Sequence, residues 1–139
     1  MRKILIFLMV ISYFFIVSCN SGSQINGNST RTALRSVKRL KNRLPTEQRI
    51  AFEISFWSMR DTHQDEAEFL DRVGGKTPEE IIIAGKKIFQ ERKAAGFKDY
   101  EEFSTWEEMI AKFTKERMDQ GSKKQSRDRR EDHSVLYKL

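Results

Sequence analysis

The sequence predicts an all-α protein in which a small bundle of four to five helices forms one domain. Apolar residues recur at intervals of three and four along several stretches, a spacing typical of amphipathic helices. Residues 76–82 carry a strong start signal for a helix. Cys19 is the only cysteine, so no disulfide can form within the chain and packing alone must hold the domain together.

The first nineteen residues, MRKILIFLMVISYFFIVSC, have the three parts of a secretory signal peptide. Arg2 and Lys3 give a positive start, an apolar run broken only by Ser12 covers residues 4–17, and Ser18 is the small residue before the cut. The run has fourteen residues, whereas a membrane-spanning helix needs roughly 20. This favours a signal peptide, with an uncleaved anchor helix as the alternative.

The segment Ile16-Val17-Ser18-Cys19 resembles the lipobox of bacterial lipoproteins. That resemblance implies cleavage between Ser18 and Cys19, a diacylglycerol on the Cys19 thiol and an acylated new amino terminus. The lipobox more often begins with Leu and has Ala or Gly before the cysteine, so Ile16 and Ser18 match its looser form. We therefore expect the bundle to lie behind a cleaved lipoprotein signal peptide, residues 1–18, in a protein of the cell envelope.

Residues 19–30 are predicted to form a flexible tether that begins at the lipidated Cys19. Ile25 is its only bulky apolar residue, and the root-mean-square reach of such a linker is roughly 18 Å. In the enterobacterial sorting rule for lipoproteins, Asp directly after the lipidated cysteine retains the protein in the inner membrane. Residue 20 is Asn, so in a cell with two membranes we expect the outer one.

The domain itself is predicted to cover residues 31–118, and its first helix covers residues 31–44. Apolar residues in this stretch step by three, three and four, at Leu34, Val37, Leu40 and Leu44. Six of its fourteen residues are basic and none is acidic. One interpretation is a basic helix that lies on anionic lipid. The other is a bundle helix with a charged face in solvent, and the narrow apolar stripe favours it. The residues that would contact lipid are Arg35, Lys38, Arg39 and Arg43.

The second helix is predicted over residues 47–59, after Pro45 ends the first and with Thr46 as its N-cap. Its apolar residues form two rows, so we expect it to pack on a broad arc in the core. The rows are Phe52 and Phe56, and Ile50, Ile54 and Trp57. A short third helix over residues 65–73 ends at two consecutive glycines.

The clearest local signal predicts a helix that starts after Thr77 and runs to Ala95. Thr77 as N-cap, Pro78 at the first helical position and Glu80 three residues after the cap form a capping box. Gly85 costs about 1 kcal/mol against Ala inside a helix, so we expect it to mark the close approach of a neighbouring helix. A phosphate-binding loop at residues 75–77 is excluded, because residue 70 would have to be glycine.

The last ordered stretch is predicted over residues 98–118, with Ser104 or Thr105 able to start a second helix within it. Its aromatic-rich stripe is more typical of a core than of a partner groove, and comprises Tyr100, Phe103, Trp106, Ile110 and Phe113. Residues 119–139 are polar and basic, and we expect a disordered tail there.

The sequence does not offer the residues of an enzyme or of a metal site. The histidines are His63, in a predicted turn, and His133, in the tail, and Cys19 is assigned to lipid. A zinc site of the usual ligand spacing cannot be assembled from these residues. The carboxylates of residues 61–71 have the pattern of a solvated face. We therefore expect a protein without catalysis, cofactor or metal.

Residues 32–95 resemble a group of small uncharacterised bacterial lipoproteins. In that group a lipobox is followed by a helix, a Leu-Pro segment, an aromatic-bearing helix and a Gly-Lys-Thr-x-x-Glu-Ile-Ile helix start. The matching residues are Leu44-Pro45, Phe52, Gly75-Lys76-Thr77 and Glu80-Ile81-Ile82. The resemblance implies a lipoprotein but assigns no functional site.

The function that we expect is a membrane-tethered lipoprotein that serves as a protein-binding or structural module in the cell envelope. The net charge of +6, which falls to +4 once Arg2 and Lys3 leave with the signal, fits anionic headgroups. Nucleic acid is a poor alternative partner for this positive charge if the protein is exported. The alternative is a protective lipoprotein, for toxin immunity or for phage or plasmid exclusion. A carrier of a small ligand would need a cavity between Phe52, Trp57, Trp106 and Phe113.

Overall fold

The computed structural model describes residues 22–135, with side chains to residue 122. The predicted signal peptide, Cys19 and the last four residues lie outside this range. The described chain contains six α-helices and no strand, which confirms the all-α prediction. The helices are α2 (Thr30–Lys41), α3 (Thr46–Thr62), α4 (Glu66–Val73), α5 (Pro78–Ala94), α6 (Lys98–Glu101) and α7 (Trp106–Val135). There is one helix more than the predicted four to five, because residues 98–118 hold the single-turn α6 as well as the start of α7. No helix of the described residues is long and apolar enough to cross a membrane.

Residues 22–29 are packed against the body, so the flexible tether predicted for this stretch is wrong there. The amide of Ile25 donates to the carbonyl of Lys76 at 2.9 Å, and the amide of Gly75 donates to the carbonyl of Ile25 at 2.8 Å. The Ile25 side chain is 2% exposed. A Cβ on Gly27 would lie 2.7 Å from the Cα of Gly74, so only glycine permits this approach. The folded domain therefore begins before residue 31.

Helix α2 packs with one face and leaves its basic residues in solvent. Ser29 and Thr32 form a capping box that starts it one residue earlier than predicted. The buried residues are Ala33, Ser36, Val37 and Leu40. Leu34, which the sequence pattern placed on the apolar stripe, is 39% exposed. Asn42 caps the helix at its C-terminal end, before the predicted Leu44.

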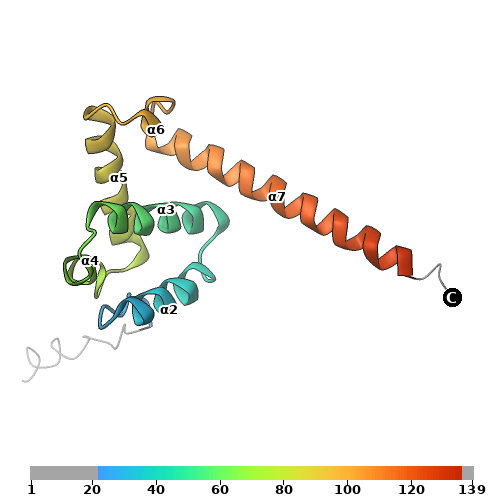
Figure 1. Ribbon diagram of the computed structural model, residues 1–139, viewed down its shortest axis with the longest axis horizontal. Coiled ribbons are helices and arrows are strands. Elements are labelled where there is room, and N and C mark those ends of the chain that lie inside the picture. The colour runs from blue at the N-terminus through green and yellow to red at the C-terminus, as the bar shows by residue number, and fades with distance from the viewer. Residues whose placement is uncertain (1–21, 136–139) are drawn as a thin grey trace, which may run out of the picture.

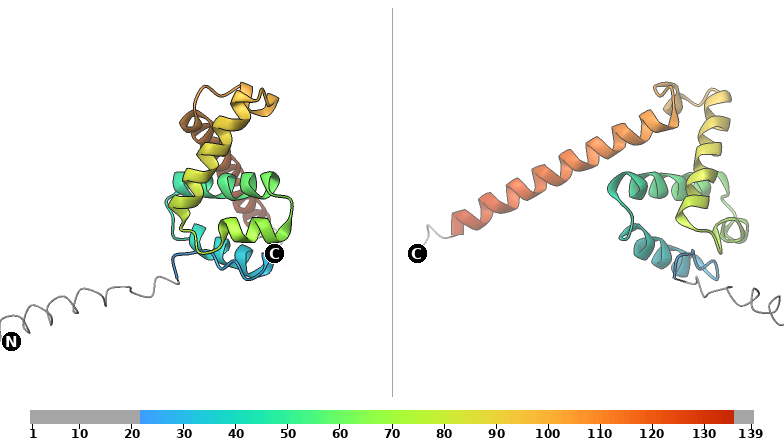
Figure 2. Two further views of the ribbon diagram at one scale, coloured as in Figure 1. Left: turned by 90° about the vertical axis from the view of Figure 1, so that its left-hand side faces the viewer. Right: turned by 180° about the vertical axis from the view of Figure 1, so that it is seen from behind.

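Helices α3 and α5 form the centre of the molecule and cross each other (Figures 1 and 2). At the crossing, a Cβ on Gly85 would lie 2.1 Å from Ser55 Oγ and 2.7 Å from Ser55 Cα. Ser55 is fully buried and its hydroxyl donates to the carbonyl of Ala51. The expectation that Gly85 marks a close helix approach is confirmed, and so is the capping box of Thr77 and Glu80 at the start of α5.

Two apolar clusters meet along α3. The first joins α2, α3, α4 and α5, and its members are Ile25, Ala33, Val37, Leu40, Phe52, Phe56, Met59, Phe69, Val73, Ile81 and Ile88. The second joins α3 and α5 to α7, and its members are Ala51, Phe89, Phe103, Trp106, Met109 and Ile110. Two faces of α3 are thus apolar because it contributes to both clusters.

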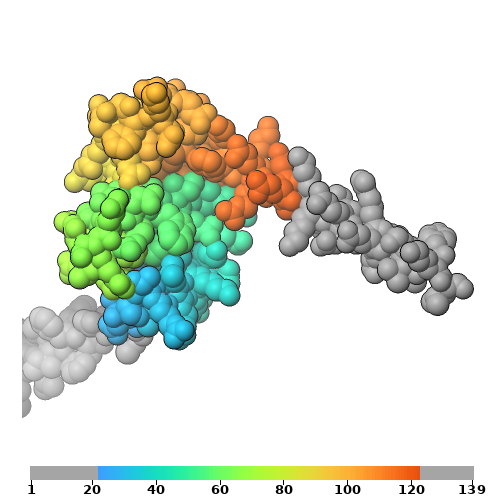
Figure 3. Space-filling model, viewed as in Figure 1, coloured from blue at the N-terminus to red at the C-terminus, as the bar shows by residue number. Residues whose placement is uncertain are grey.

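Helix α7 begins against the second cluster, where its first turns lie on the body (Figure 3), and then leaves the body (Figure 1). It continues to Val135, so the disordered tail predicted from residue 119 is wrong for residues 119–135. Low apolar content predicts that a segment does not pack, but it does not forbid a helix. Residues 119–135 contain no proline, and eight of the seventeen are Lys, Arg, Gln or Glu, which are good helix formers.

Candidate functional site

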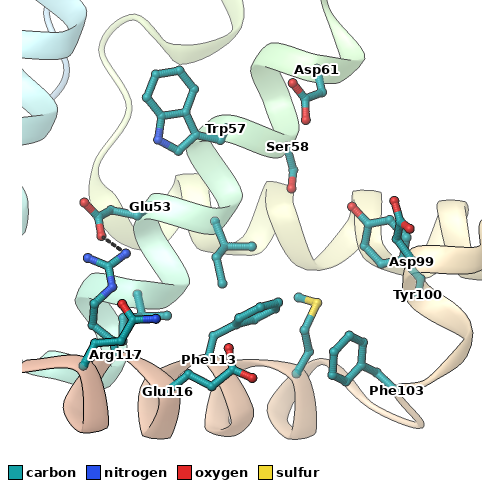
Figure 4. Close-up of a pocket in the computed structure, with 14 residues that line it drawn as sticks. Glu53, Trp57, Ser58, Asp61, Asp99, Tyr100, Phe103, Phe113, Glu116 and Arg117 are labelled. Atoms are coloured by element: carbon teal, nitrogen blue, oxygen red, sulfur yellow. Dashed lines mark ion pairs between the residues drawn. The ribbon is translucent and has the colours of Figure 1, made fainter. Parts of the chain in front are cut away.

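A groove lies between α3 and α7, and the α6 corner closes one end of it (Figure 4). Its volume is about 530 Å³. On α3 the lining residues Ile50, Ile54, Trp57 and Asp61 recur at intervals of four, three and four. On α7 the lining residues Met109, Phe113, Glu116 and Gln120 recur with the same intervals. Each set is one stripe of a helix, so the groove follows both helices for about three turns.

The floor of the groove is apolar because α7 covers only part of the second face of α3. Ile50 and Met109 are buried, but Trp57 is 52% exposed and Phe113 is 37% exposed. The prediction that Trp57 and Phe113 belong to the core is therefore wrong, whereas it is confirmed for Phe103, Trp106 and Ile110. A tryptophan that is half exposed beside buried isoleucine and methionine is a surface on which a partner could bury apolar area.

Carboxylates surround this apolar floor. Four of them line the groove, namely Glu53, Asp61, Asp99 and Glu116, against the single cation Arg117. Glu53 already pairs with Lys41 of α2 and, at 3.8 Å, with Arg117 of α7. The carboxylates of Asp61, Asp99 and Glu116 form no hydrogen bond or ion pair with another described residue. The rim of the groove is thus acidic, although the chain as a whole is basic.

Hydrogen bonds fix the closed end of the groove. The guanidinium of Arg92 on α5 donates to Tyr100 Oη and to Thr62 Oγ1, both at 2.9 Å, and so ties the α6 corner to the end of α3. Lys93 donates to the carbonyl of Phe103. Lys112 donates to Glu102 at 2.6 Å, and this hydrogen bond raises the pKa of Lys112. The groove therefore has rigid walls at the α6 corner.

The groove is open along its length, so it is not the enclosed cavity that a small-ligand carrier would need. Phe52 is buried in the first apolar cluster and Trp106 in the second. Only Trp57 and Phe113, of the four residues named for such a cavity, line the groove. The structure therefore does not bring these four side chains together around one hole.

A second surface is the basic face of α2. Arg35, Lys38, Arg39 and Arg43, the predicted lipid-contact residues, are all exposed. Arg43 donates to the carbonyl of Gly22 at 3.3 Å. The other three form no ion pair with a described residue, whereas Lys41 of the same helix pairs with Glu53 of α3. The helix packs with its apolar face and exposes its basic face at the same time. A bundle helix and a helix that contacts anionic lipid are therefore compatible interpretations of this stretch.

The described residues offer little chemistry beyond these surfaces. His63 Nδ1 lies 2.8 Å from Glu68 Oε1, near the end of α3. Among residues 22–135 no group of three or more His, Cys, Asp or Glu side chains is placed to hold a metal ion. The predicted lipidation at Cys19 and cleavage after Ser18 lie outside the described residues.

Sequence reasoning placed α3 and the aromatic stripe but missed the groove residues Asp61, Asp99, Glu116 and Arg117. A signal for two of them was present. The apolar spacing of Ile50, Ile54 and Trp57 continues to Asp61, and that of Met109 and Phe113 continues to Glu116. An apolar row that continues into acidic residues indicates a face that is only partly covered.

No protein-family model matches this chain, and neither a curated protein nor a solved structure is similar enough to be matched to it.

Proposed function

We propose that this protein is a membrane-tethered bacterial lipoprotein that acts as a non-catalytic protein-binding or structural module in the cell envelope. The observation that carries the binding role is the groove between α3 and α7, where the half-exposed Trp57 lies on an apolar floor. Exposed aromatic residues beside apolar pockets are frequent anchors of protein interfaces. The lipid on Cys19 would hold this groove at the membrane surface.

The position of α2 supports a tethered arrangement. Gly22, where the described chain begins, is hydrogen-bonded to Arg43 just after α2, and it is only three residues from Cys19. A lipid on Cys19 would therefore keep the basic face of α2 close to the membrane. Cations near an anionic surface contribute about 1 kcal/mol each. Figure 1 shows α2 at one end of the body and the α6 corner at the other, so α2 would lie nearest the lipid.

Site-specific photocrosslinking of the full-length protein in the cell that produces it tests the binding role. A photoreactive amino acid at position 57 should give a discrete crosslinked species in the membrane fraction. The matched control is position 83 on α5, where Ile83 is 70% exposed but does not line the groove. Equal crosslinking at the two positions, or none at position 57, would contradict the proposal.

Deletion of the gene separates the structural module from the protective alternative. Loss of an envelope module should change permeability or cell shape under ordinary growth. Loss of a protective lipoprotein should have no effect until the toxin, phage or plasmid arrives.

A further inference from the structure

We propose that the groove between α3 and α7 binds a cationic amphipathic helix of a partner protein. This inference rests on the proposed function and names the chemistry of the partner. The groove is formed by matching stripes of two helices, Ile50 to Asp61 on α3 and Met109 to Gln120 on α7. The first and last residues of each stripe are eleven positions apart, which is about 16 Å along the helix axis. A third helix of about three turns would fill this length, which is the helix-in-groove mode of recognition.

The floor and the rim of the groove specify two properties of that helix. The apolar floor of Trp57, Phe113 and Ile54 would be covered best by a helix with apolar side chains at intervals of three and four. Asp61, Asp99 and Glu116 favour cations beside that apolar row: their carboxylates have no ion pair among the described residues, although Lys112 lies close enough to Glu116 to interact with it electrostatically. Asp61 and Asp99 lie at one end of the groove, and Glu116 lies toward the other (Figure 4). Cations at both ends of the bound helix would therefore find carboxylates.

A second copy of the chain does not supply such a helix from the described residues. Helix α2 is basic, but its apolar residues Ala33, Val37 and Leu40 are already buried and only Leu34 is exposed. The projecting part of α7 is basic as well, but between Asp119 and Ser134 it contains no bulky apolar residue. Neither of these two helices offers the apolar row that the floor requires, and this favours an occupant from another protein.

A synthetic peptide serves as the probe, with the full-length protein held in nanodiscs of zwitterionic lipid. The peptide has about 14 residues, or roughly four helical turns, with Leu at intervals of three and four and Lys at the other positions. Its counterpart carries Glu in place of Lys, and empty nanodiscs measure binding to lipid. Fluorescence anisotropy of the labelled peptide should show saturable binding with a Kd below about 100 μM. The counterpart should not bind, and salt should weaken the binding of the Lys peptide.

Variants locate the binding. The combined change Asp61→Asn, Asp99→Asn and Glu116→Gln keeps the side-chain shapes and should weaken binding about tenfold. Trp57→Ala should weaken it at least tenfold, and because Trp57 is half exposed the fold should survive, as circular dichroism can check. The matched control is the same loss of charge away from the groove, with Asp71→Asn, Glu79→Gln and Glu91→Gln. These control residues are all exposed, and binding should not change.

Several results would overturn the inference. The inference is wrong if the Lys peptide shows no saturable binding or if the Glu peptide binds equally well. It is also wrong if the groove and control variants weaken binding equally, or if a second copy of the chain occupies the groove. If the peptide results fail but position 57 still crosslinks to a membrane partner, the proposed function stands. The partner would then bind through a segment other than a cationic amphipathic helix. Loss of crosslinking together with loss of peptide binding would reject both.

Discussion

The close contact between α3 and α5 predicts that Gly85→Ala destabilises the protein, although alanine is the better helix former. An ideal Cβ at residue 85 would lie 2.1 Å from Oγ, 2.4 Å from Cβ and 2.7 Å from Cα of Ser55. Ordinary contacts of a Cβ begin at 3.4 Å. Rotation of the serine side chain relieves only the first of the three contacts, so the helices themselves must separate by roughly 1 Å.

The expected magnitude is a net loss of about 2 kcal/mol in the free energy of unfolding. Alanine gains about 1 kcal/mol over glycine from helix propensity. Overpacking of a core costs about 1–3 kcal/mol, and we expect the upper end because a backbone atom of Ser55 is involved. Urea unfolding followed by far-ultraviolet circular dichroism measures the difference, which corresponds to about 8 °C in Tm.

Gly121→Ala is the matched control, since Gly121 is also helical and a Cβ there meets nothing within 4 Å. It should stabilise α7 by at most about 1 kcal/mol through propensity alone. If Gly85→Ala stabilised the protein as Gly121→Ala does, the two helices could not cross at Ser55, and our account of the core would be wrong.

Three further predictions concern the N-terminal segment, acid stability and the basic face of α2. Gly27→Ala should lower the free energy of unfolding by about 2 kcal/mol, because the new Cβ meets backbone atoms that cannot rotate away; urea unfolding measures this. The hydrogen bond from the Thr77 amide lowers the pKa of Glu80, so its stabilising charge is present above the ordinary carboxyl pKa of about 4.3 and is lost as the pH falls through the lowered value. The Tm difference between wild type and Glu80→Gln should therefore be larger near neutral pH than in acid. Replacing Lys38, Arg39 and Arg43 with Gln should weaken the binding of the unlipidated domain to anionic vesicles at low salt several-fold, as vesicle co-sedimentation can measure.

Each of these has its own control. Gly22→Ala changes a glycine with nothing within 4 Å and should leave stability nearly unchanged, so a loss as large as that of Gly27→Ala would point to a general effect of the segment. A Tm difference for Glu80→Gln that grows in acid would contradict the sign of the pKa shift. Replacing the exposed Lys87, Lys98 and Lys115 with Gln removes the same charge elsewhere, and an equal loss of vesicle binding would reject a specific role for α2.

The elements that could be predicted from the sequence are those that local chemistry determines. The capping box of Thr77 and Glu80 needs only residues three apart, and the helical rows of α3 and α5 need only their spacing. Gly85 could be identified because an interior glycine is costly and so indicates a close neighbour. These signals lie within one helix or between a helix and its cap.

The features that were missed depend on contacts between distant parts of the chain. Ile25 is held by hydrogen bonds to Gly75 and Lys76, about fifty residues away, and the residues next to Ile25 carry no sequence signal that predicts these bonds. Trp57 has the spacing of a core residue, but it is half exposed because α7, which pairs with α3 at Glu53 through Arg117, leaves the Trp57 side of α3 uncovered. The groove depends on how α7 lies against α3, and the spacing of residues within each helix does not determine that arrangement.

The central claim is that a lipid on Cys19 tethers this domain to a membrane. The most direct test is the intact mass and membrane flotation of the native protein beside a Cys19→Ala variant, both expressed with their own first eighteen residues. We predict that the wild type loses residues 1–18, gains the mass of lipid and floats with membranes, whereas the variant does neither. If both proteins keep residues 4–17 and stay in the membrane without added lipid mass, the segment is an anchor helix and the lipoprotein account is contradicted.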